Sequence, residues 1–119
     1  MVIAIDYDKT ITDNTPYPLE GNIRPEALKY IPLLYEAGHT LVLWTARRYP
    51  DYKEAVDRLE KVGLKKYFSG IGILKQGYVG KIEADFYIDD RAIPGELNWE
   101  TIYNYIINKE EKSNENVLC

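Results

Sequence analysis

Short apolar runs alternate with segments of helical periodicity along the chain. The runs at residues 2–5, 41–44 and 84–88 are rich in branched and aromatic side chains and predict buried strands. Residues 70–74 predict a further strand, although its two glycines weaken the propensity for extended structure. These runs are too short for helices, so they favour a sheet in the interior of the protein.

Three other segments carry apolar residues at helical spacing and predict helices at residues 25–37, 52–62 and 99–108. In the first of them Pro32 cannot donate the helical hydrogen bond, which predicts a bend there or two short helical pieces. The apolar stripe expected on this first helix consists of Leu28, Ile31, Leu34 and Tyr35.

Alternation of strand and helix predicts an α/β fold, namely a three-layer sandwich with a mostly parallel, Rossmann-like sheet. The 119 residues fit one domain, which we expect at residues 1–108. Residues 109–119 are polar, and we expect them to form a frayed C-terminal tail.

The net charge and the cysteine content argue against several classes of function. A formal net charge of −4 argues against non-specific binding of nucleic acid, which needs a basic face. Cys119 is the single cysteine, so an internal disulfide and a cysteine-based metal site are both excluded. Because no apolar run approaches the length of a membrane helix and no leader pattern precedes the first strand, we expect a cytoplasmic protein without membrane contact.

Polar side chains follow three of the predicted strands where each ends. The acids Asp6 and Asp8 follow the first, Thr45 ends the second, and Asp89 and Asp90 follow a later one. Parallel strands bring their carboxyl ends to one edge of the sheet, where ligands of such folds bind. Four carboxylates at one edge need a cation, and hard oxygen ligands suit Mg²⁺ better than zinc.

These motifs resemble those of the haloacid-dehalogenase-like phosphohydrolases. The family's first motif, Asp-x-Asp-x-Thr, is similar to residues 6–10, its second to residues 41–45, and its fourth to residues 87–90. The third motif is a single lysine, for which Lys81 is our choice and Lys75 the alternative. Lys9 departs from the pattern, because many members carry glycine at that position.

The resemblance implies a role for each of these residues. Asp6 would attack phosphorus to form an aspartyl-phosphate, while Asp8 would protonate the leaving group and then activate water. Thr45 and Lys81 would hold the transferring phosphoryl oxygens. The residues expected to hold Mg²⁺ are Asp6, Asp8 through its backbone carbonyl, Asp89 and Asp90, and the candidates for substrate binding are Lys9, Thr10, Arg47 and Arg91.

The function expected from this resemblance is that of a magnesium-dependent phosphomonoester hydrolase, a phosphatase of the haloacid-dehalogenase-like type. The short segments at residues 11–22 and 47–83 leave no room for the family's cap domains. A capless member would act on a large phosphorylated molecule, or on a sugar phosphate or nucleotide with neighbours in a homo-oligomer serving as lids.

Two other classes of protein fit part of this pattern of motifs. A response-regulator-like domain also gathers acids, a threonine, a lysine and Mg²⁺, but it is phosphorylated after its third strand, where residues 70–74 end without an acid. A phosphate-binding module without turnover would retain every required residue. Taken singly, the acids could also be helix caps or turn formers, and Lys81, Arg47 and Arg91 could be solvated charges or surface ion pairs.

Overall fold

The computed structural model describes residues 1–17, 19–47, 51–73, 84–89 and 97–118, with side chains described as far as residue 71 in the third range and residue 109 in the last. Four strands and three α-helices alternate along most of this part of the chain. In chain order these are β1 (Val2–Asp6), α1 (Pro25–Glu36), β2 (Thr40–Thr45), α2 (Asp51–Lys61), the short 3₁₀ helix η1 (Lys65–Tyr67), β3 (Phe68–Ile73), β4 (Phe86–Ile88) and α3 (Trp99–Leu118).

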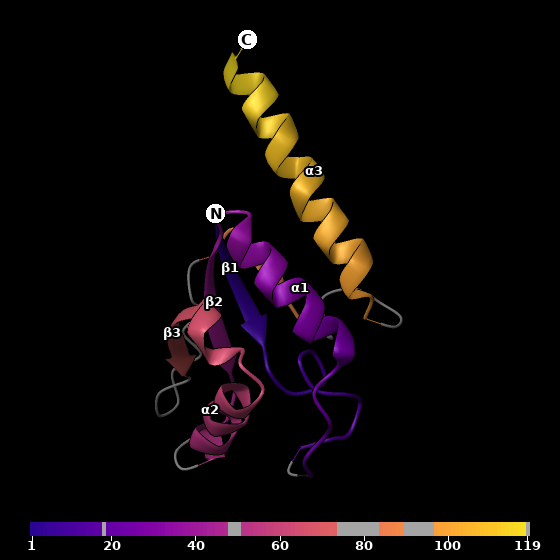
Figure 1. Cartoon of the computed structure of the whole chain (residues 1–119), viewed down its shortest axis with the longest axis vertical. Coiled ribbons are helices and arrows are strands. Elements are labelled where there is room, and N and C mark those ends of the chain that lie inside the picture. Colours follow the sequence, from indigo (N-terminus) through magenta and orange to yellow (C-terminus); the bar gives the residue numbers. More distant parts are fainter. Residues whose placement is uncertain (18, 48–50, 74–83, 90–96, 119) are drawn as a thin grey trace.

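All four described strands pair in parallel, in the order β3-β2-β1-β4. The first strand therefore lies inside the sheet, between β2 and β4, as its continuous apolar sequence requires. Helices flank the sheet, and in Figure 1 α1 lies in front of it with the first part of α3 beside α1. This is the predicted α/β class of Rossmann-like three-layer folds, and the described residues include no cap domain.

A single apolar cluster joins the sheet to the helices. Alternate residues of the strands, among them Ile3, Ile5 and Leu43, are fully buried against side chains of all three helices. Trp99, at the start of α3, is also fully buried, so the beginning of this helix is fixed to the core.

The buried stripe of α1 differs from the predicted one. Its buried residues are Ala27, Tyr30, Ile31 and Leu34. The predicted Leu28 and Tyr35 are instead 41% and 50% exposed. The helix is rotated toward α3, where Tyr30 packs on Tyr103 with ring centroids 5.3 Å apart. It is also one continuous helix with Pro32 inside it, so a break into two pieces is wrong.

Helix α3 is longer than predicted and contains 20 residues. It continues to Leu118, so the predicted end of this helix at residue 108 is wrong, and the segment in which a frayed tail was expected is helical as far as residue 118. This extension is rich in Glu, Lys and Asn and contains no Gly or Pro, so nothing in it interrupts a helix. The sequence pattern missed it because the extension carries no regular apolar stripe.

Within the part of the chain that the structure describes, no helix combines the length and the apolar character needed to cross a membrane.

Candidate active site at the carboxyl edge of the sheet

The predicted acids and hydroxyl meet at one edge of the sheet. Asp6 ends β1 and pairs in register with Trp44, whose neighbour Thr45 ends β2. On the other side of β1, Ile5 pairs with Ile88, so that Asp89, the next residue, leaves the sheet beside Asp6. The register thus brings Asp6, Thr45 and Asp89 to the same edge.

A hydrogen bond within the segment after β1 fixes the orientation of Asp6. The Oγ1 atom of Thr10 donates to Oδ2 of Asp6 over 3.2 Å, and Thr10 is fully buried. In this arrangement Thr10 positions Asp6. Its predicted contact with substrate stays a prediction.

The chain turns sharply after Asp6. The carbonyl of Tyr7 accepts hydrogen bonds from the backbone N–H groups of Thr10, Ile11 and Thr12, at 3.3, 3.0 and 3.2 Å. Lys9, in the middle of this turn, has a φ of 63°. A left-handed conformation costs a residue with a side chain about 1 kcal/mol, which gives a physical reason for glycine at this position of the motif. Lys9 adopts the left-handed conformation of this turn in spite of its cost in free energy.

Asp8 is held by a two-pronged ion pair. The Nε and Nη2 atoms of Arg47 donate to the two carboxylate oxygens of Asp8 over 2.8 and 2.7 Å. The Arg47 side chain is only 3% exposed and that of Asp8 is 24% exposed. The hydrogen bond to Asp8 raises the pKa of Arg47 above its ordinary value, against the opposing effect of burial. Asp6 and Asp8, two residues apart, therefore have different partners.

Thr45 connects this pair to the second strand. Its hydroxyl oxygen accepts a hydrogen bond of 3.1 Å from the backbone N–H of Arg47, and the residue is 1% exposed. A hydroxyl that accepts one hydrogen bond still has its own proton to donate. Thr45 therefore lies at the edge where the acids lie with a proton free to donate, and its predicted role in holding phosphoryl oxygens stays a prediction.

Two tyrosines surround the guanidinium of Arg47. Its Cζ atom lies 5.0 Å from the ring centroid of Tyr7 and 5.0 Å from that of Tyr17. The loop at residues 13–22 supplies Tyr17, and Asp13 closes the base of this loop by accepting backbone hydrogen bonds from Thr15 and Asn22. A hydrogen bond with the Thr15 side chain, followed by these backbone hydrogen bonds, lowers the pKa of Asp13. The sequence did not single out Tyr17, because no periodicity links it to residues thirty positions away.

Several predicted residues lie outside the described part of the chain: Lys81, its alternative Lys75, Asp90 and Arg91. Among the described residues no group of three or more His, Cys, Asp or Glu side chains is arranged to hold a metal ion. The donors that are described at this edge, the carboxylates of Asp6 and Asp89 and the carbonyl of Asp8, are hard oxygen atoms, which is the chemistry that Mg²⁺ prefers. The prediction of a magnesium site stays a prediction.

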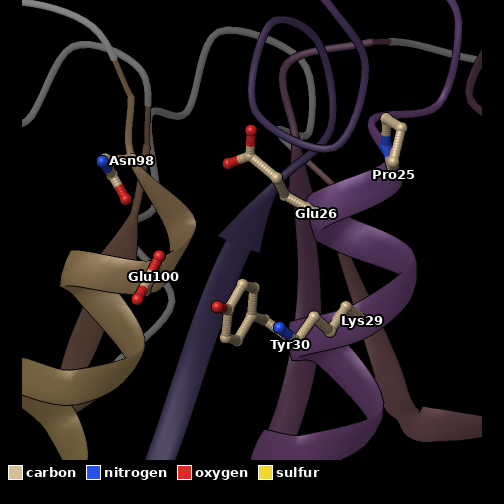
Figure 2. Close-up of a pocket in the computed structure, with 6 residues that line it drawn as sticks. All are labelled: Pro25, Glu26, Lys29, Tyr30, Asn98 and Glu100. Atoms are coloured by element: carbon tan, nitrogen blue, oxygen red, sulfur yellow. The ribbon is translucent and has the colours of Figure 1, made fainter.

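A separate pocket of about 400 Å³ opens between the beginnings of α1 and α3. In Figure 2 Glu26 and Tyr30 of α1 face Glu100 of α3 and Asn98, which precedes that helix. The pocket is lined by Pro25, Glu26, Lys29, Tyr30, Asn98 and Glu100, none of which belongs to the predicted site. Both helices follow the carboxyl ends of strands, so the pocket and the acids lie toward the same end of the molecule.

Comparison with known proteins gives one informative match. No family model matches this chain, and no curated protein matches it. A solved structure of a conserved protein from Bacteroides thetaiotaomicron is 34% identical in sequence, with a TM-score of 0.78, over 92% of this chain and 91% of the other. The chain belongs to the family of this conserved Bacteroides protein. That relationship supports the fold over nearly its whole length, while the chemistry must be inferred from the side chains described above.

Proposed function

We propose that this protein is a magnesium-dependent phosphomonoester hydrolase that works through an aspartyl-phosphate on Asp6. The observation that carries the proposal is the arrangement at the carboxyl edge of the sheet. There, Asp6 and Asp89 leave neighbouring parallel strands side by side, Thr45 ends the strand on the other side, and Asp8 is oriented separately by Arg47. These residues are among those to which the resemblance to haloacid-dehalogenase-like phosphohydrolases assigns roles, together with Lys81 and Asp90.

The different surroundings of the two aspartates support two different roles. Asp6 accepts a hydrogen bond from a neutral hydroxyl, which orients the carboxylate without neutralising it. Both carboxylate oxygens of Asp8 accept hydrogen bonds from the Arg47 guanidinium, which fixes the direction in which this side chain faces. Enzymes of this kind need one carboxylate as nucleophile and another as proton carrier.

Asp6, Asp89 and Asp90, with the backbone carbonyl of Asp8, are the groups that would hold Mg²⁺. When bound, the ion would offset the repulsion between these acids and the charge of the phosphoryl oxygens. The side chains of this chain perform the remaining steps.

In the first step a carboxylate oxygen of Asp6 attacks phosphorus while the bond from phosphorus to the leaving oxygen breaks, and Asp8 gives its proton to that oxygen. In the second step water attacks the phosphorus of the aspartyl-phosphate, Asp8 takes the proton from the water, and phosphate leaves Asp6 unchanged. Thr45 donates to a phosphoryl oxygen in both steps, and Lys81 supplies positive charge.

The substrate class that we propose is a phosphomonoester: a sugar phosphate, a nucleotide or a larger phosphorylated molecule. Neighbouring copies in a homo-oligomer would serve as lids for a small substrate.

The test is hydrolysis of an aryl phosphate by the whole chain, with Mg²⁺ and with a chelator, beside the variant Asp6→Asn. We expect activity that requires Mg²⁺ and falls at least about 10³-fold in Asp6→Asn, because the nucleophile is lost. Rapid quenching with hydroxylamine should trap an acyl-phosphate at Asp6 in the parent protein and none in the variant.

Full activity in Asp6→Asn would refute the assignment of the nucleophile. Absence of turnover on a panel of phosphate esters, with beryllium fluoride still binding in the presence of Mg²⁺, would favour the phosphate-binding module. A stable phosphoryl group on Asp6, transferred from acetyl phosphate and not hydrolysed, would favour the signalling domain.

A further inference from the structure

Arg47 contacts protein groups on several sides. Its side chain is 3% exposed, its Nε and Nη2 atoms donate to Asp8, and its backbone N–H donates to Thr45. Two tyrosine rings lie 5.0 Å from its Cζ atom. A guanidinium so enclosed is poorly placed to bind a substrate from solvent. Its contacts instead favour a role in holding Asp8.

The first of these rings is fixed by helix α2. Tyr7 is fully buried, and its Oη atom accepts a hydrogen bond of 3.1 Å from Nη1 of Arg58. The Nη2 atom of Arg58 also donates to the carbonyl of Gly21 over 2.5 Å. Burial raises the pKa of Tyr7, against the opposing effects of Arg58 and Arg47, so its ring stays a neutral phenol beside the two arginines.

The second ring is fixed by the same helix. Tyr17 is 47% exposed, and its Oη atom donates a hydrogen bond to Oδ2 of Asp51 in the first turn of α2. That hydrogen bond raises the pKa of Tyr17. Asp51 and Arg58 are seven residues apart on one helix, which is about two turns, so they lie on the same side of it. One rigid element therefore holds both tyrosines.

We propose that Asp51 and Arg58 of α2 are positioning residues that hold Asp8 in place through Tyr17, Tyr7 and Arg47. Asp51 and Arg58 fix the two rings, the rings confine the guanidinium, and the guanidinium fixes both oxygens of the Asp8 carboxylate. The catalytic part of this inference rests on the proposed function, because it assigns Asp8 as the proton carrier. The positional part does not depend on it.

The positional part is tested without turnover, by nuclear magnetic resonance of the Arg47 Nε–Hε group in the whole chain. Its signal is assigned from its loss in Arg47→Lys. We expect slow exchange of this proton with water in the parent protein, and exchange at least about tenfold faster in Tyr17→Ala and Arg58→Met, because the pair with Asp8 then opens more often. Tyr17→Phe, which removes only the hydroxyl, should have an intermediate effect.

Glu60→Gln is the matched control on the same helix. Glu60 pairs with Lys65 at 3.8 Å, and both side chains are more than half exposed. Exchange at Arg47 should therefore be unchanged in Glu60→Gln. Unchanged exchange in Tyr17→Ala and Arg58→Met, in proteins whose circular dichroism matches the parent, would overturn the inference whether or not the protein is a phosphatase.

The catalytic part is tested by comparing a phosphate ester with a good aryl leaving group and one with a poor alkyl leaving group. We expect kcat for the alkyl ester to fall about tenfold or more in Tyr17→Ala and Arg58→Met, and kcat for the aryl ester to change less than about threefold, since only the alkyl ester needs a well-placed proton donor. KM should change little. Equal losses for both esters would show a merely structural role and refute the catalytic part, while the loss of all activity in Asp6→Asn would still support the proposed function.

Discussion

The acids at the carboxyl edge of the sheet and those in the pocket between α1 and α3 lie toward the same end of the molecule but in opposite physical situations. Asp6 and Asp8 are partly buried, and each accepts a hydrogen bond of 3.2 Å or less from a neighbouring side chain. Glu26 and Glu100 are exposed side chains on the first turns of two helices, where a carboxylate stabilises the helix dipole. The pocket between α1 and α3 is therefore a poorer candidate for chemistry than the acids at the carboxyl edge, which neighbouring side chains hold in place.

The largest expected difference between the two regions is catalytic. Asp8→Asn should lower kcat for an alkyl phosphate by about 10² to 10⁴, the usual contribution of a general acid and base. The double variant Glu26→Gln with Glu100→Gln should change kcat/KM less than about threefold. Steady-state kinetics on both proteins makes the comparison, and a larger loss in the double variant would move the site to the pocket.

A second difference concerns stability. Arg47→Met should lower the free energy of unfolding by about 2–3 kcal/mol, because it leaves the Asp8 carboxylate without its partner. The value is below that of a fully buried pair, since Asp8 is 24% exposed. Urea denaturation measures it, with Lys65→Met as the control: that variant breaks an exposed pair and should cost less than about 0.5 kcal/mol. Equal losses of unfolding free energy in Arg47→Met and Lys65→Met would mean that Arg47 and Asp8 do not interact in solution.

Trp99 connects the two regions. It begins α3 beside the pocket, and its Nε1 atom donates a hydrogen bond of 3.0 Å to the carbonyl of Thr10, in the turn that orients Asp6. Trp99→Phe should cost about 2–3 kcal/mol from the lost hydrogen bond and the cavity left behind. Tyr105→Phe on the same helix, where the side chain is 58% exposed, is the control and should stay within about 0.5 kcal/mol of the parent in thermal unfolding. A cost near zero for Trp99→Phe would show that α3 and the turn are independent.

The smallest expected effect is a gain in stability. Lys9→Gly should raise the free energy of unfolding by about 0.5–1 kcal/mol, because glycine adopts the positive φ of this position without strain. Lys9→Ala keeps a Cβ atom and should give no comparable gain. Calorimetry of the three proteins checks this, and destabilisation by Lys9→Gly would indicate that the lysine side chain has a compensating contact.

Periodicity and chemistry together were sufficient to predict the parallel α/β fold and the convergence of Asp6, Thr45 and Asp89 at one edge, because strand ends in such a fold share an edge. The prediction of the buried face of α1 was wrong at Leu28 and Tyr35, which are exposed. The packing of α1 against α3 decides which side of this helix is buried, and the sequence pattern of α1 alone does not contain that information. The contacts of Arg47 with Asp8 and Tyr17 could not be predicted, since they join residues 30 to 39 positions apart that no local pattern relates.

The length of α3 has a practical consequence. At 1.5 Å per residue its 20 residues span about 30 Å, and in Figure 1 the helix extends well beyond the sheet, past the end of the molecule that holds the N-terminus. The only cysteine of the sequence, Cys119, directly follows it. A dye or a surface for immobilisation attached at the last turn of α3 would therefore lie at the opposite end of the molecule from the carboxyl end of β1, leaving the carboxyl edge of the sheet open to ligands in solution.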